Sequence, residues 1–291
     1  MSEWINLREE RDFGEKFNAT FQFASQNFRS LSICLLFLGA PLMIIANLFV
    51  AHFQTKLGVG NMNNAQGVRE LVWYMYLVIL PVYLVAYTWL MTLTYAYISE
   101  YLAGNREITP AQVFGRAIKK LPKILLANLV STILIIIAFL LLIVPGIYFM
   151  IAITFIQAII IIEEQPVFKS FSRSITLISG KWWSTFGLVV VMGIISGLMQ
   201  LIFTIPTYVN AAIKVLHKSA EMLAFDWGTI LTNMVSTVGI TLLYPLIFIA
   251  IAFQYFNLVE RRESQGLKQQ IIMASQQIES TVNDGNRHIN G

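Results

Sequence analysis

The sequence has 291 residues, of which 56% are hydrophobic and only 12% are charged. Soluble domains carry roughly 25% charged residues, and a soluble protein of this composition would expose large apolar patches. Composition therefore excludes an ordinary soluble domain and favours a polytopic membrane protein. The net charge of +4 does not indicate a nucleic-acid partner, because the basic residues flank apolar segments instead of forming a stripe on a polar domain.

Residues 1–30 predict a cytoplasmic segment that contains one amphipathic helix. Its apolar residues recur at helical spacing and share one face, namely Phe13, Phe17, Phe21, Ala24 and Phe28. Lys16 lies off this face, and Phe23 interrupts the pattern. Helices of this kind lie in the membrane interface with their apolar face towards the acyl chains.

Five long apolar runs follow, and a membrane-spanning helix needs ~20 residues. The run from Ile124 to Ile162 holds 39 consecutive residues without a charge. As one straight helix it would be ~58 Å long, about twice the ~30 Å thickness of the hydrocarbon core. Two shorter helices fit the bilayer, so this run predicts two spans.

A Pro-Gly pair lies near the middle of that run. Pro145 lacks an N–H and disfavours helix at Val144, and Gly146 can adopt turn conformations that most residues avoid. Val144 to Ile147 is therefore predicted to form a tight hairpin turn. The alternative is one kinked helix with a re-entrant half.

With this hairpin the membrane domain covers residues 31–257 and has six spans. Their predicted bounds are 31–50, 71–98, 124–144, 147–162, 186–209 and 229–256. Sixteen of the 20 Lys and Arg residues fall on one side of this arrangement, and basic residues concentrate on the cytoplasmic side. Both termini are therefore expected in the cytoplasm, with residues 258–291 as a partly disordered tail.

Two further segments resemble the first amphipathic helix. Thr109 and Pro110 are typical of a helix start, and the residues that share a face after them are Val113, Phe114, Ala117, Ile118 and Leu121. The third segment begins at Pro166, and its apolar face holds Phe168, Phe171, Ile175 and Ile178. Leu177 interrupts that face, and Gly180 is typical of a helix end.

The predicted fold is an all-α, polytopic membrane bundle of six transmembrane helices. It is built as three repeats of an interfacial amphipathic helix plus a helical hairpin. The interfacial helices could bind anionic lipid headgroups, or they could be connectors that anchor the loops. The sequence leaves both interpretations open.

The stretch from Val144 to Gly187 resembles a motif of bacterial six-span membrane proteins. That superfamily includes the membrane domain found with glycerophosphoryl diester phosphodiesterases and several uncharacterised families. The matching residues are Val144, Pro145, Gly146, Ile147, Tyr148, Glu163 or Glu164, Arg173, Ser174, Gly180, Lys181, Trp182 and Trp183. The resemblance implies a multi-pass protein of the bacterial inner membrane, and WINLREERDFGEKFNATFQF resembles Bacteroidetes members. It does not imply phosphodiesterase activity.

The predicted spans contain no Asp, Glu, Lys, Arg or His, which argues against a proton-coupled pump. Their amide side chains are Asn47, Asn128, Gln157, Gln200, Asn233 and Gln254. These side chains are expected to form hydrogen bonds between helices, and a polar substrate pocket is the alternative.

No residue pattern predicts a catalytic, cofactor or metal site. The histidines have no ligand spacing, and no phosphate-binding glycine loop or nucleophile motif is present. Glu163 and Glu164 form the one tempting carboxylate pair. They are expected to be interfacial ion pairs that cap a loop, and catalysis with Arg173 is the alternative.

The sequence therefore predicts a non-enzymatic integral protein of the inner membrane, acting as a scaffold or in envelope homeostasis. A channel or carrier for a small molecule or lipid is the alternative. The expected partners are the lipid bilayer, anionic headgroups on the cytoplasmic face and other membrane proteins.

Overall fold

The computed structural model describes residues 4–57, 65–105, 107–216, 227–264, 271–272 and 275. Every regular element in this part of the chain is a helix. Six helical segments in it are long and apolar enough to cross a membrane: Phe28–Val50, Val72–Leu102, Pro110–Leu141, Ile143–Ile162, Trp182–Lys214 and Trp227–Glu263. The all-α, six-span prediction is thus confirmed at this level.

Several of these spans are made of more than one element. The α-helices are α1 (Phe13–Gln26), α2 (Phe28–Cys34), α3 (Ala40–Leu57), α4 (Ala65–Tyr74), α5 (Leu80–Leu102), α6 (Pro110–Leu141), α7 (Ile143–Ala152), α8 (Ile156–Ile162), α9 (Val167–Ile178), α10 (Trp182–Leu216), α11 (Trp227–Leu243) and α12 (Pro245–Glu263). Short π-helical segments join α2 to α3 and α4 to α5, at Leu35–Gly39 and Met75–Ile79. Pro41 and Pro81 follow them closely, and a widened turn accommodates a proline that cannot donate to the helix.

The third and fourth spans form a hairpin, but the predicted position of its turn is wrong. The chain reverses at Leu142, whose backbone is extended (φ −162°, ψ 146°). Pro145 lies in the first turn of α7, where N–H groups have no partner within the helix, so the proline there costs no hydrogen bond. The N–H of the next residue, Gly146, donates to the carbonyl of Leu142 (3.1 Å). Gly146 allows close packing instead, because a Cβ at this position would lie 2.7 Å from the ring of Phe139.

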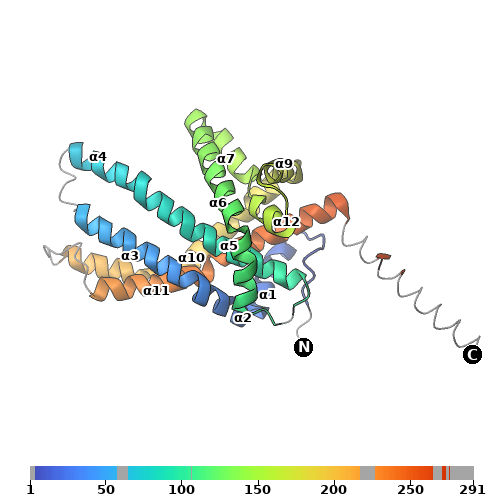
Figure 1. Cartoon of the computed structure of the whole chain (residues 1–291), viewed down its shortest axis with the longest axis horizontal. Coiled ribbons are helices and arrows are strands. Elements are labelled where there is room, and N and C mark those ends of the chain that lie inside the picture. Colours follow the sequence, from blue (N-terminus) through green and yellow to red (C-terminus); the bar gives the residue numbers. More distant parts are fainter. Residues whose placement is uncertain are drawn as a thin grey trace, which may run out of the picture.

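The helices leave a common base in two directions. In Figure 1, α3, α4, α10 and α11 extend to one side, and the α6–α7 hairpin diverges from them. The outer half of the hairpin packs only lightly on other helices, and its residues 140–144 are exposed. The base is the densely packed part of the molecule, where α12, the second half of α5 and α8 are buried.

At one end of this base lie the segments whose Lys and Arg content predicts that they share one side of the membrane. Ile5 N donates to Tyr101 Oη (3.0 Å), and Arg11 N donates to Asn257 Oδ1 (2.9 Å). The side chain of Arg262 donates to the carbonyl of Ser179 (2.6 Å). We call this region, formed by residues 4–29, 99–105, 107–123, 163–185 and 254–263, the polar end.

The three amphipathic segments differ in how they are built. The first and third are separate helices, α1 and α9, whereas the second is continuous with the span and forms the beginning of α6. Phe23 and Leu177, which interrupt the predicted stripes, are fully buried against the protein. Much of each predicted apolar face points outwards instead, as in Phe168, which is 73% exposed.

Candidate functional site

The carboxylate pair of the sequence motif splits between two ion pairs at the polar end. Glu163 faces Arg173, whose Nε and Nη2 donate to its carboxylate at 3.1–3.2 Å. Arg173 also pairs with Glu263 at the end of α12, and Tyr255 Oη donates to Glu163 Oε1 (2.7 Å). Burial acts to lower the pKa of Arg173, but its bonds to Glu263 and Glu163 outweigh burial and raise that pKa overall.

The fourth span is broken between α7 and α8, and the side chain of Ser174 on α9 forms hydrogen bonds with backbone groups on both sides of the break. Its Oγ donates to the carbonyl of Ala152 (2.8 Å) and accepts the N–H of Phe155 (3.3 Å). Both Ser174 and Phe155 are fully buried. Since unpaired backbone groups are costly at membrane depth, this serine makes the break tolerable.

The remaining motif residues fasten α9 and α10 to the same span. Gly180 has φ 76°, a left-handed conformation that glycine adopts without strain, and it ends α9. Lys181 follows, and its carbonyl accepts the N–H of Thr185 (3.1 Å). The Trp182 ring stacks on Tyr148, and its Nε1 donates to the Tyr148 carbonyl (3.1 Å). The motif therefore clamps α9 and the start of α10 onto the broken span.

A buried lysine lies beside this clamp. Lys16 of α1, predicted outside the apolar face, is only 2% exposed. Its Nζ donates to Gln254 Oε1 (2.7 Å) and lies 3.4 Å from Ser184 Oγ, and Gln254 Nε2 donates to Thr185 Oγ1 (2.9 Å). Burial, followed by the positive charge of Arg261, lowers the pKa of Lys16 to about 8. A predicted intramembrane amide thus serves as the acceptor for a buried ammonium group.

A hollow of about 470 Å³ lies along the beginning of α6. Its lining residues are Glu100, Ala111, Gln112, Gly115, Arg116, Lys119, Lys120, Lys123 and Glu164. Arg116 Nε donates to Glu100 Oε1 (2.6 Å), and Lys120 Nζ donates to Glu164 Oε1 (2.7 Å). We call it the basic hollow, because four cationic and two anionic side chains surround it.

The pKa of Glu164 reflects the positive charge around the basic hollow. Its pKa is lowered, first by the hydrogen bond from Lys120 and the charge of that lysine, and further by the charges of Arg116 and Lys123. Its backbone lies in the left-handed region (φ 57°), which is uncommon for a residue with a side chain. Positive charge therefore dominates the basic hollow.

Most of the predicted intramembrane amides join spans. Asn128 Nδ2 donates to Thr88 Oγ1 (2.7 Å), and Gln157 Nε2 donates to Asn128 Oδ1 (2.6 Å), which links the second, third and fourth spans. Asn47 accepts from Tyr83 Oη (2.8 Å) and donates to Thr237 Oγ1 (3.2 Å). These networks stitch helices together.

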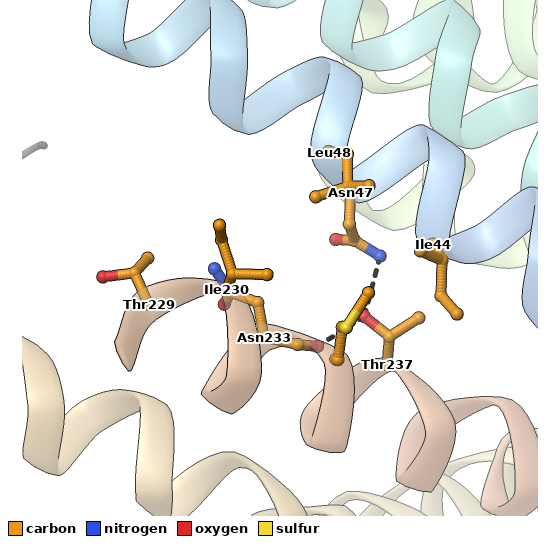
Figure 2. A pocket seen from close by; sticks show the side chains of 8 residues that line it. Ile44, Asn47, Leu48, Thr229, Ile230, Asn233 and Thr237 are labelled. Carbon is orange, nitrogen blue, oxygen red and sulfur yellow. Dashed lines mark hydrogen bonds between the residues drawn. The ribbon is translucent and has the colours of Figure 1, made fainter. Parts of the chain in front are cut away.

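Asn233 and Gln200 are not part of these inter-helix networks among the described contacts. Figure 2 shows Asn47 of α3 directed at Thr237 of α11, with Asn233 one turn away on α11. Asn47, Asn233 and Thr237 line a pocket between α3 and α11 that encloses about 10 Å³, which is room for about one water molecule. Among the described contacts Gln200 takes part through its backbone carbonyl, which accepts from Thr204 Oγ1 (3.4 Å).

Four residues of the polar end were missed by sequence reasoning: Lys16, Glu100, Tyr255 and Glu263. Glu100 lies just beyond the predicted end of the second span, because α5 continues to Leu102. On α12, Tyr255 and Glu263 lie two helical turns apart, and that spacing could have indicated a polar face. No sequence signal pairs either of them with Arg173.

A family described as a domain of unknown function, DUF7847, matches residues 108–258. The matched region begins just before α6 and ends within α12, so it includes the broken span, Arg173 and most of the basic hollow. No curated protein and no solved structure matches the chain.

Proposed function

The chain belongs to the DUF7847 family, and we propose that it is a non-catalytic protein of the bacterial inner membrane. In this proposal both termini lie in the cytoplasm, and the polar end lies at the level of the cytoplasmic headgroups. There the protein acts as a scaffold that brings anionic lipid and membrane-protein partners together, with a role in envelope homeostasis.

The observation that carries this proposal is the outward position of aromatic side chains at the polar end. Phe28, Phe114 and Phe168 lie on three different segments and are all exposed. Phe28 and Phe168 each precede an exposed basic residue, Arg29 and Lys169, and Phe114 lies two positions before the half-buried Arg116. Phenylalanine beside exposed Lys or Arg is the composition of a helix that lies in the headgroup layer.

The alternatives receive less support. A carrier needs a polar site along its path, but Asn128, Gln157 and Asn47 bond to neighbouring helices. Catalysis by Glu163 or Glu164 would need a carboxylate free to act, and each is engaged by a basic partner.

Depth measurements test the proposed placement. Spin labels are attached to Phe168→Cys and, as a matched control, Lys169→Cys, in chains that also carry Cys34→Ala and are reconstituted in liposomes. We expect the label at 168 to collide mainly with lipid-soluble oxygen and the label at 169 with a water-soluble relaxation agent. Equal access of the aqueous agent to both positions would contradict an interfacial α9.

Crosslinking tests the scaffold role. Crosslinked cells expressing the full chain should yield defined membrane proteins on purification, and the same proteins should be lost when Phe28, Phe114 and Phe168 are all replaced by Ser. Recovery of the chain alone, under every crosslinking condition, would argue against a scaffold.

A further inference from the structure

We propose that the basic hollow binds the phosphate group of an anionic phospholipid, whose acyl chain lies along the exposed face of α6. This inference rests on the proposed placement of the polar end at the headgroups. It adds a defined site, a ligand class and the residues that contact it.

The charges of the basic hollow are only partly compensated. Arg116 is neutralised by Glu100, and Lys120 by Glu164. Lys119 and Lys123 are exposed, and neither makes an ion pair or a hydrogen bond within the described residues. Two ammonium groups one helical turn apart can therefore hold one anion of the size of a phosphate.

The same face of α6 continues as an exposed apolar strip. Lys119 and Lys123 are followed at helical spacing by exposed apolar residues, namely Leu126, Leu129 and Ile133. From Lys123 to Ile133 a helix rises ~15 Å, which is about half the thickness of the hydrocarbon core. A cationic end followed by one leaflet of exposed apolar surface matches a lipid with an anionic headgroup.

The wall of the basic hollow also leaves room for a ligand. Gly115 lines it, and a Cβ built at this position would meet nothing within 4 Å. Glycine within a helix is less favourable than alanine by about 1 kcal/mol. A side chain at this position would project into open space, so a large residue there should obstruct the basic hollow without changing its charge.

The apolar strip favours a lipid over free phosphate as the occupant. Phe114 and Ile118 are exposed on the neighbouring face of the same helix, so apolar surface borders the basic hollow on two sides. A free phosphate ion would use only the two lysines, whereas a phospholipid would use the strip as well.

Native mass spectrometry of the full chain in detergent tests the proposal by titration with three probes: phosphatidylglycerol, phosphatidylcholine and inorganic phosphate. We expect phosphatidylglycerol to bind more tightly than phosphatidylcholine. The double variant Lys119→Gln/Lys123→Gln should weaken phosphatidylglycerol binding by about 10- to 30-fold. Gly115→Leu should weaken it too, although the charge is unchanged.

The control is the double variant Arg29→Gln/Lys169→Gln, which removes the same charge from the polar end at exposed positions outside the basic hollow. Equal weakening in both double variants would overturn the proposal, since it would show general surface electrostatics. Equal binding of both lipids, or displacement of the lipid by equimolar inorganic phosphate, would overturn it as well. Monodisperse elution of each variant shows that it folds.

The two proposals fail in distinguishable ways. If the label at Phe168→Cys has an interfacial depth, but the Lys119→Gln/Lys123→Gln variant binds phosphatidylglycerol as tightly as the wild type, only the proposed lipid site is wrong. If the label is aqueous, the placement of the polar end is wrong whatever the lipid titration shows.

Discussion

Helix α12 and the outer half of the α6–α7 hairpin are both strongly apolar, yet their surroundings are opposite. Nearly every residue of α12 from Pro245 to Glu260 is buried by protein. At the hairpin tip the residues are exposed, and Leu140 reaches 81%. Hydropathy alone therefore does not tell a helix that faces lipid from one that faces its neighbours.

Polar residues do tell the two regions apart. Gln254, Asn257 and Glu260 lie on α12 and are all buried, while residues 133–147 contain no polar side chain. A polar group in a membrane protein needs a protein partner, whereas lipid is as apolar as leucine and offers none. Amides that bond to another helix, such as Asn128 and Gln254, therefore mark the faces that pack against other helices.

The largest expected effect is a direct contrast between the two regions. Phe253→Ala empties a site of the α12 core that is 1% exposed, and it should lower the free energy of unfolding by about 3–5 kcal/mol. Leu140→Ala at the hairpin tip should change it by less than about 0.5 kcal/mol. Equilibrium unfolding in mixed micelles, followed by tryptophan fluorescence, measures both. Similar losses would show that the hairpin tip is buried in the membrane by a partner.

The next effect concerns the broken fourth span, which connects the hairpin to the core. Ser174→Ala leaves the buried carbonyl of Ala152 and the N–H of Phe155 without their side-chain partner. We expect a loss of about 1–3 kcal/mol in the free energy of unfolding. Ser172→Ala, on the exposed face of the same helix, is the control and should be nearly neutral. Equal losses in the free energy of unfolding for the two variants would show that Ser174 does not cap the broken span.

A smaller effect is expected inside the hairpin. Gly146→Val forces a side chain against Phe139 and should destabilise the chain by about 1 kcal/mol, near the lower end for overpacking, because a hairpin that faces lipid can relax. Phe139→Ala in the same chain should restore most of the loss. Gly197→Val, at a position where a Cβ meets nothing within 4 Å, is the matched control. Without rescue by Phe139→Ala, the close contact would not explain the glycine.

Much of the fold could be predicted, because length and hydropathy are local properties. The 39-residue run is too long for one span, and that argument correctly predicted two helices. It did not locate the turn, because proline is accepted in the first turn of a helix as readily as in a loop. Pro145 therefore lies in the first turn of α7, which begins at Ile143, while the chain reverses at Leu142.

The site was harder to predict, because its contacts join residues far apart in the sequence. The charge count gathers the basic segments on one side, but it does not reveal that Arg173 meets both Glu163 and Glu263. Periodicity identified the apolar face of α1 but not its direction. The helix packs on the protein through Phe23 and Lys16 and turns most of its other phenylalanines outwards.

The smallest effect tests the one charged side chain of α1 that the core buries. The pKa of Lys16 is about 8 in the folded chain and 10.5 in its ordinary state, so between these values the unfolded chain binds more protons. The free energy of unfolding should therefore rise with pH, by at most about 1 kcal/mol from about pH 7.5 to about pH 9.

Arg261, Asp12 and Lys181 also act on the Lys16 ammonium group, so the informative quantity is the difference between the wild type and Lys16→Met. That variant should lose the rise, and Lys169→Met at an exposed position should keep it. An unchanged slope in Lys16→Met would mean that the lysine is hydrated, and that α1 packs on α12 less tightly than the bond to Gln254 indicates.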